Sequence, residues 1–396
     1  MLRFLTAGES HGPSLSVIVE GLPSGLSVRE DELASELARR RLGFGRGPRM
    51  RFERDELRLI GGVRHGRTLG SPVAIEILNT EWPKWEVEMS AAPGTPGKKL
   101  TTPRPGHADL AGMQKYAFDD ARDVLERASA RETVARVAAG HFAKALLATI
   151  DVDVLSHVIR IGGVATPEGT RPSPSELAQV DESEVRCFDA SSETAMVAEI
   201  KAAAKEGDSL GGIVEVIAYG VPVGLGSYVH WDRKLDGLLA GALMSIQAVK
   251  AVEIGDGFAQ ASQRGSVSHD AIATDTSHAR GGGYIRRTDH AGGLEGGMSS
   301  GAPIIVRVAM KPLATLNRPV LETVDVASGE SAISFKERTD VTAVPAMGVV
   351  SEAMVALVLA NEALRKFGGD TVEEFTRNYN GYLANLGSTA SAARPD

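Results

Sequence analysis

The segment Gly61–Ile75 reads GGVRHGRTLGSPVAI. It aligns without gaps on a distant segment of the same chain, Gly292–Val306, which reads GGLEGGMSSGAPIIV. Both begin with a glycine pair and end in an apolar run, which predicts a glycine turn that leads into a strand. A match between two distant segments indicates that one structural unit occurs twice.

A second pair of segments repeats in the same order. GLPSGL at 21–26 matches GVPVGL at 220–225, and we expect an apolar strand before each of them. A helix is expected between the members in both halves. The pattern predicts a duplicated strand–helix–strands unit, with halves at about 1–150 and 205–345 that share one core. The alternative is a chance match, because 44 residues of this chain are glycine.

We expect one domain over residues 1–386 and a disordered tail over 387–396. Leucine spacing predicts a helix over 29–41, and a capped helix is expected from about 129 to 150. The low-charge segment 235–252 is interpreted as another helix, in which Gly237 and Gly241 would permit close packing.

Composition limits the possible classes of protein. The chain has 396 residues, of which 43% are hydrophobic and 24% are charged, as in a soluble globular protein. A single cysteine, Cys187, excludes an intramolecular disulfide and a multi-cysteine metal site, and we predict no metal. No secretion signal and no apolar run of about 20 residues were recognised. We therefore expect a cytoplasmic protein that does not enter a membrane.

Positive charge is concentrated in one stretch although the net charge is −8. This distribution favours an anionic small-molecule ligand over nucleic acid, and a solvated basic face is the alternative. Seven arginines fall within sixteen residues: Arg39, Arg40, Arg41, Arg46, Arg49, Arg51 and Arg54.

Two histidines occur in glycine-containing loops. His11 lies in TAGESHG at 6–12, and His107 lies in RPGHAD at 104–109. Such loops let the backbone approach a ligand closely, although a histidine that only caps a polar loop is the alternative. We expect Glu9 and Asp109 to orient the two imidazoles.

The entrance to the predicted long helix reads ERASARET at 126–133. Ser129 and Glu132 have the spacing of a capping box, and two arginines at a helix N-terminus can bind an anion. The alternative is a capped helix with arginines on its surface.

With these motifs in order, nearly the whole chain resembles the chorismate synthase family. The resemblance implies a β/α/β sandwich of the α+β class, with a helical layer between antiparallel sheets. It implies a homotetramer that converts 5-enolpyruvylshikimate 3-phosphate to chorismate by an anti 1,4-elimination of phosphate. Reduced FMN is implied as a cofactor that undergoes no net oxidation, with NADPH as a candidate external reductant. No nucleic acid or membrane partner is expected.

The resemblance also implies site roles. His11 would protonate the departing phosphate, His107 would favour the reduced monoanionic flavin, and Asp340 would assist proton transfer at the flavin. The implied substrate-binding residues are Arg40, Arg46, Arg49, Arg104, Arg131 and Arg338. The implied FMN contacts are Arg127, Ala128, Ser129, Gln247, Ala248, Gly296, Lys311, Pro312, Leu313, Ala314, Thr315 and Arg338.

Two positions depart from common family versions, Ala128 and Thr339, and both affect details of flavin contact. We expect the loops 45–50, 90–101 and 315–340 to order on ligand binding.

Two other functions remain open at this point. One is an FMN reductase that uses NAD(P)H, although the chain lacks a Gly-x-Gly-x-x-Gly strand–helix fingerprint. The other is nucleic-acid binding through residues 39–54, which would weaken steeply with salt and would leave the two histidines unexplained.

Overall fold

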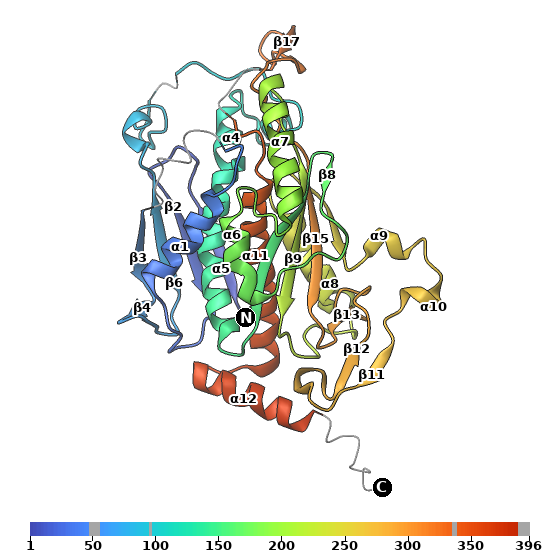
Figure 1. Cartoon of the computed structure of the whole chain (residues 1–396). Coiled ribbons are helices and arrows are strands. Elements are labelled where there is room, and N and C mark those ends of the chain that lie inside the picture. Colours follow the sequence, from blue (N-terminus) through green and yellow to red (C-terminus); the bar gives the residue numbers. More distant parts are fainter. Residues whose placement is uncertain (47–55, 95–96, 335–338, 387–396) are drawn as a thin grey trace.

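The computed structural model describes residues 1–46, 56–94, 97–334 and 339–386. Two antiparallel sheets face each other with helices between them (Figure 1), so the predicted α+β sandwich is confirmed. The first sheet has the order β1-β2-β6-β3 and the second has the order β10-β15-β9-β7-β8. Their strands are β1 (Arg3–Ala7), β2 (Ser14–Glu20), β3 (Leu57–Gly61), β6 (Val73–Leu78), β7 (Asp153–Ile161), β8 (Val164–Ala165), β9 (Gly212–Tyr219), β10 (Val249–Ile254) and β15 (Ile304–Met310).

Alternation along the strands explains which face is buried. In β2, Leu15, Val17 and Val19 are buried and point to the helices, while Ser16 and Ile18 between them are exposed. The second sheet is apolar on both faces over part of its width, because Ile217 and its neighbours form a small separate cluster on the outer side. The main core therefore lies between the sheets.

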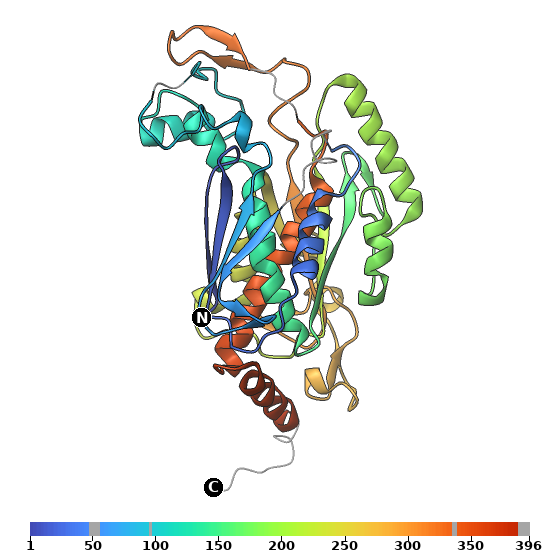
Figure 2. The same ribbon diagram turned by 90° about the vertical axis from the view of Figure 1, so that its left-hand side faces the viewer.

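Four helices form the central layer. Helix α5 packs against α11 along its length, while α1 packs on both of these helices and α8 packs on α11. Figure 2 shows the same layer from the side of the first sheet. The α-helices of the described residues are α1 (Glu30–Arg41), α3 (Asp109–Tyr116), α4 (Arg122–Ala128), α5 (Thr133–Ala148), α6 (Leu177–Glu182), α7 (Ala190–Glu206), α8 (Leu235–Met244), α9 (Gly257–Gln260), α10 (Gly265–Ser268), α11 (Val344–Phe367) and α12 (Val372–Asn385).

Smaller elements decorate the ends of the sandwich. The hairpin β16–β17 lies near α3 and α4 at one end, and α12 crosses the opposite end (Figures 1 and 2). The short strands are β4 (Val63–Arg64), β5 (Arg67–Thr68), β11 (Ile272–Thr274), β12 (Tyr284–Arg286), β13 (Leu294–Glu295), β14 (Met298–Ser299), β16 (Glu322–Val324) and β17 (Ser331–Ile333). The 3-10 helices are η1 (Trp82–Lys84), η2 (Ala130–Glu132), η3 (Pro174–Glu176), η4 (Trp231–Arg233) and η5 (Ala279–Gly281).

The two halves share their strand order. Within the second sheet, β7-β9-β15-β10 follows the same path as β1-β2-β6-β3 in the first. The aligned residues Thr68 and Ser299 also make the same bonds, since each hydroxyl donates to the carbonyl of Pro23 or Pro222, respectively, at 2.6 Å. Each hydroxyl also accepts from the amide three residues beyond that proline. We propose that one unit was duplicated within a single domain, and these matched bonds support the proposal.

The segment 235–252 is not one helix, which corrects the expectation from its composition. Helix α8 ends at Met244, and strand β10 begins at Val249. Ala248 between them has a left-handed φ of 66°, which a continuing helix cannot accommodate. Gly237 and Gly241 make no close packing contact among the described residues of this chain, because a Cβ at either position would meet nothing within 4 Å.

Helix α11 is long and apolar enough to cross a membrane by length and composition alone. The expectation that no such run exists was therefore wrong. The helix is the centre of this fold, however, and 89% of its most apolar window is buried inside the chain. Its hydropathy is explained by contact with α5 and with both β7 and β9.

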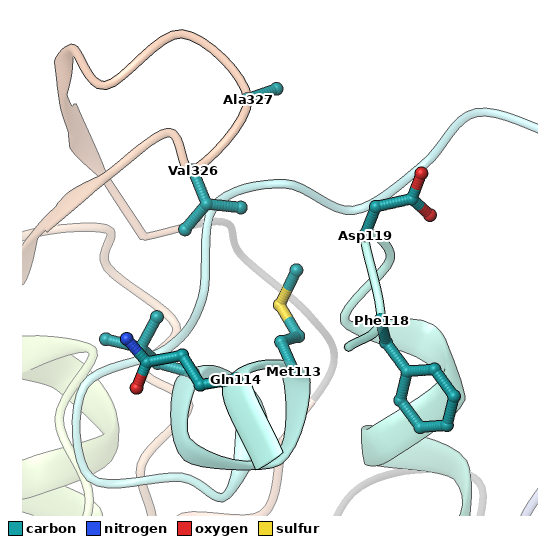
Figure 3. Close-up of a pocket in the computed structure, with 7 residues that line it drawn as sticks. Met113, Gln114, Phe118, Asp119, Val326 and Ala327 are labelled. Carbon is teal, nitrogen blue, oxygen red and sulfur yellow. The ribbon is translucent and has the colours of Figure 1, made fainter. Parts of the chain in front are cut away.

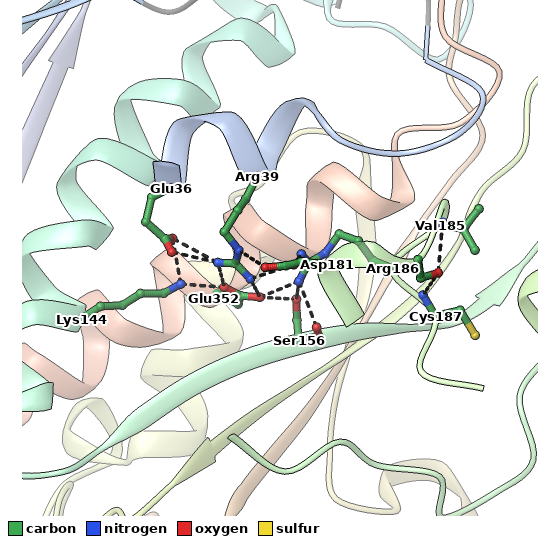
Figure 4. Close-up of polar contacts among 10 residues, drawn as sticks. Glu36, Arg39, Lys144, Ser156, Asp181, Val185, Arg186, Cys187 and Glu352 are labelled. Atoms are coloured by element: carbon green, nitrogen blue, oxygen red, sulfur yellow. Dashed lines mark hydrogen bonds and ion pairs between the residues drawn. The ribbon is translucent and has the colours of Figure 1, made fainter. Parts of the chain in front are cut away.

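A balanced cluster of charges is buried beside α11 (Figure 4). Glu352 is fully buried and accepts hydrogen bonds from Arg39 at 2.8 Å, from Lys144 at 2.6 Å and from the Ser156 hydroxyl at 2.7 Å. Burial opposes its charge, but the surrounding cations hold the pKa of Glu352 well below its usual range. Three cations and three carboxylates form the cluster: Arg39, Lys144, Arg186, Glu36, Asp181 and Glu352.

Glycine-to-alanine substitutions at Gly140 in the core and Gly381 on the surface should have opposite effects on stability. A Cβ at Gly140 of α5 would lie 2.3 Å from the Cβ of Ala353 on α11, whereas a Cβ at the exposed Gly381 of α12 meets nothing within 4 Å. Gly140→Ala should lower the free energy of unfolding by about 1–3 kcal/mol because it overpacks the interface. Gly381→Ala should raise it by up to about 1 kcal/mol through helix propensity. Urea denaturation measures both, and a shift of the same sign in the two variants would contradict this packing.

Candidate active site

His11 is held by the buried end of α4. The loop between β1 and β2 turns at Gly8, whose φ is 105°, and the His11 amide donates to the Glu126 carboxylate at 2.8 Å. The Nδ1 atom of His11 lies 2.9 Å from Oε1 of the same carboxylate, and the Glu126 side chain is only 2% exposed. Burial opposes the charge of Glu126, but the bonds from His11 and the charge of Arg122 hold its pKa below the usual value.

Glu126 therefore takes the role that we had expected of Glu9, and that expectation was wrong. Glu9 is next to Ser10 in sequence, and its carbonyl accepts from the Gly12 amide at 3.1 Å, which closes the loop on itself. The Ser10 amide donates to the Glu126 carbonyl at 2.9 Å, so the loop docks on α4 through both main chain and side chain.

Asn79, which the sequence did not single out, joins the His11 loop to Arg131. Its amide nitrogen donates to the Gly12 carbonyl at 2.9 Å, and its Oδ1 accepts from Arg131 Nη1 at 3.2 Å. Asn79 is buried at the end of β6. The Asn79 side chain thus ties the loop of the predicted acid, His11, to the predicted anion-binding residue Arg131.

The predicted pairing of His107 with Asp109 is present. Asp109 is fully buried at the start of α3, contacts His107 Nδ1, and accepts from Arg104 Nε at 2.9 Å. Burial opposes its charge, but these two donors hold the pKa of Asp109 well below its usual range. Arg104 also donates to the Thr315 hydroxyl at 3.1 Å, which brings the second half of the chain to this histidine.

Further contacts hold three of the predicted flavin residues, Gln247, Ala248 and Lys311. Gln247 donates to Glu132 at 3.1 Å, and the Lys311 amide donates to the Ala248 carbonyl at 3.0 Å. The Lys311 ammonium contacts the Gly106 carbonyl beside His107. The His107 loop therefore contacts the segment after β15 directly, and Gln247 links this segment through Glu132 to Thr6 at the start of the His11 loop.

Residues 311–315 continue directly from the end of β15, where the sheet ends. Leu313 is fixed by the Ser209 hydroxyl, which donates to its carbonyl at 2.8 Å. Pro312 and Ala314 lie in the same stretch, and a Cβ on Gly106 would come within 3.9 Å of the Ala314 methyl group. Residues at both ends of this segment, Lys311 and Thr315, thus contact the His107 loop, and Ser209 holds its middle.

Arg40, Arg46 and Asp340 are further predicted site residues that the structure describes. Arg46 Nε lies 3.1 Å from Asp340 Oδ2, and the Gly45 carbonyl accepts from the Val341 amide at 2.8 Å. Arg40 is buried, and its Nη1 lies 3.5 Å from the Thr133 hydroxyl at the start of α5. Arg49 and Arg338 lie outside the described residues, as do parts of the loops 45–50, 90–101 and 315–340.

The 127–129 segment lies next to the His11 loop. Arg127 donates to the Gly8 carbonyl at 3.0 Å and to the Thr6 hydroxyl at 2.7 Å, and Ala128 ends α4. Ser129 accepts from the Arg131 amide and caps the 3-10 turn η2 that leads into α5, whereas it was expected to cap the long helix itself. The predicted capping box is wrong, because the Ser129 hydroxyl bonds Arg131 and the Glu132 carboxylate turns to Thr6, Arg136 and Gln247.

Gly296 is the predicted flavin residue that the described chain does not bring to this cluster. It lies in the turn of the β13–β14 hairpin, where Gly297 accepts from the amide of Leu235 at the start of α8. Gln247 follows the other end of α8, and a helix of this length spans about 15 Å. Its role toward flavin stays a prediction.

A small apolar pocket lies beside this cluster rather than in it. It has a volume of about 270 Å³ and is formed by α3 and the turn of the β16–β17 hairpin, with Met113, Phe118 and Val326 among its lining residues (Figure 3). Its lining includes none of the predicted catalytic or binding residues. Helix α3 thus presents Asp109 to the site at one end and packs against the hairpin farther along.

Comparison with known proteins gives consistent results. The family model described as chorismate synthase matches residues 2–364. Chorismate synthase of Frankia casuarinae is 60% identical over 98% of this chain and 99% of its own length. Chorismate synthase of Thermobifida fusca is 58% identical with the same coverage of both chains.

A solved structure agrees with the sequence comparisons. A crystal structure of chorismate synthase superposes with a TM-score of 0.78 at 39% identity and covers 98% of both chains. The similarity therefore extends over both sheets and the helical layer. The chain belongs to the chorismate synthase family.

Proposed function

We propose that this chain converts 5-enolpyruvylshikimate 3-phosphate to chorismate and phosphate, as a carbon–oxygen lyase that depends on reduced FMN. The observation that carries the proposal is the contact of the His107 loop with the segment after β15. That segment is linked through Ala248, Gln247 and Glu132 to Thr6 at the start of the His11 loop, in a chain similar to chorismate synthases over nearly its whole length. The substrate carries a phosphate and two carboxylates. Clustered arginines suit such a ligand because their planar guanidinium groups match anionic oxygens.

The residues present fit FMN. Gln247 Oε1 is buried and has no hydrogen-bond partner among the described residues, so it can accept from a bound donor. Lys311 supplies a cation at the same place, and we propose that Arg127–Ser129, Gln247, Ala248, Lys311–Thr315 and Arg338 hold the cofactor. When bound, reduced FMN supplies electron density that assists the loss of phosphate and accepts hydrogen from the substrate.

His11 is the proposed general acid. Its Nδ1 is engaged by Glu126, so the proton given to the departing phosphate oxygen would come from Nε2. Arg40, Arg46, Arg49, Arg104, Arg131 and Arg338 are proposed to bind the anionic groups of the substrate. His107, fixed by Asp109, is proposed to stabilise negative charge beside it, and Asp340 is proposed to hold the proton removed from the ring.

We also propose that the protein is a cytoplasmic homotetramer that receives reduced flavin from outside, with NADPH as a candidate electron source. The family resemblance supports the tetramer, and the single cysteine suits a reducing compartment. An intrinsic FMN reductase activity is the second candidate. It would appear as NADPH oxidation in the presence of FMN without the shikimate substrate.

Anaerobic turnover with chemically reduced FMN and 5-enolpyruvylshikimate 3-phosphate tests the proposal. Phosphate and chorismate should form in equal amounts, and His11→Asn should lower kcat by about 10²–10⁴-fold, the usual contribution of a general acid. His230→Asn is the matched control, because His230 is an exposed histidine that pairs with Asp232. No turnover by the wild-type protein, or equal rates in His11→Asn and wild type, would contradict the assignment.

Glu126→Gln should change how the activity depends on pH. The pKa of Glu126 is held below its usual value, so the carboxylate is charged at neutral pH and holds the His11 ring and amide. The variant lacks this charge at every pH, so its kcat/KM should lie below that of the wild type at neutral pH, and the difference should shrink as acid protonates Glu126 of the wild type. A pH–rate profile measures this, and a difference that does not shrink in acid would count against the proposed role.

A further inference from the structure

The ring of His11 is stacked on an indole. The His11 and Trp85 ring centroids are 4.0 Å apart, and the angle between the ring planes is 27°. Trp85 follows η1, whose first amide, that of Trp82, donates to the Asn79 carbonyl at 3.1 Å. The same Asn79 binds the carbonyl of Gly12, so the stack and the His11 loop share one anchor.

An arginine completes this arrangement. The Arg122 guanidinium carbon lies 5.2 Å from the centre of the Trp85 ring, and Nη1 donates to Glu126 at 3.2 Å. Glu88, on the segment after Trp85, lies 3.5 Å from Arg122 Nε. The carboxylates of Glu88 and Glu126 therefore balance the positive charge of Arg122 beside His11. Glu126 also binds the imidazole.

We propose that Trp85 is a positioning residue that fixes the plane of the His11 ring for proton donation. This inference rests on the proposed function of His11. The bond from Nδ1 to Glu126 fixes one edge of the imidazole, and stacking on the indole fixes the tilt of its plane.

Turnover separates a positioning role from a structural one. Trp85→Leu should lower kcat about tenfold, which corresponds to about 1.4 kcal/mol of transition-state stabilisation, with little change in KM. Trp85→Phe keeps an aromatic face and should recover most of the rate. Equal losses in both variants, or a loss expressed in KM alone, would contradict positioning.

Fluorescence tests the stack without any turnover. The chain has three tryptophans, so the Trp82→Phe, Trp231→Phe double variant contains Trp85 alone. An imidazole stacked on an indole quenches the indole emission. In the flavin-free full-length protein, His11→Asn in this background should therefore raise Trp85 emission, and the matched control His230→Asn should leave it unchanged.

The two measurements fail independently. If His11→Asn leaves Trp85 emission unchanged, the stack does not exist and the inference is overturned. If the emission depends on His11 but no variant or wild-type protein turns over, the stack is correct and the proposed function is wrong. If the stack and turnover are both present but Trp85→Leu keeps the wild-type kcat, Trp85 does not position the acid.

Discussion

The contact between Gly140 of α5 and Ala353 of α11 sets the spacing on which the whole sandwich depends. A Cβ at Gly140 would lie 2.6 Å from the Ala353 Cα, so the helix backbones approach as closely as a side-chain-free position permits. Each helix packs on a different sheet, α5 on β2 and α11 on β7 and β9. The separation of the two sheets, and of the loops at their ends, therefore follows from this contact.

The candidate active site depends on the same spacing because both halves of the chain contribute to it. Arg104 from the first half donates to Thr315 from the second, and Arg46 from the first pairs with Asp340 from the second. The buried Glu352 strengthens this arrangement, since it binds Arg39 of α1, next to Arg40, and Lys144 of α5. An ion cluster so deeply buried costs much desolvation, and it is tolerated here because three cations and three carboxylates balance.

Local patterns in the sequence predicted the elements better than the contacts among them. The glycine turns at Gly61 and Gly292 and the strands after them were predictable, because period-two alternation and turn residues act over a few positions. The left-handed turn at Ala248 was not predictable, because its carbonyl accepts a hydrogen bond from the amide of Lys311, which is far away in sequence. Likewise Glu126 and Trp85 reach His11 only through folding, so the adjacent Glu9 was the natural but wrong choice.

A structure of the protein with FMN and 5-enolpyruvylshikimate 3-phosphate bound would test the central claim most directly. The account predicts one site in which the substrate phosphate contacts His11 and the flavin contacts both the His107 loop and residues 311–315. Both halves of the chain would then touch the ligands. Ligands bound by residues of one half alone, or away from His11, would contradict it.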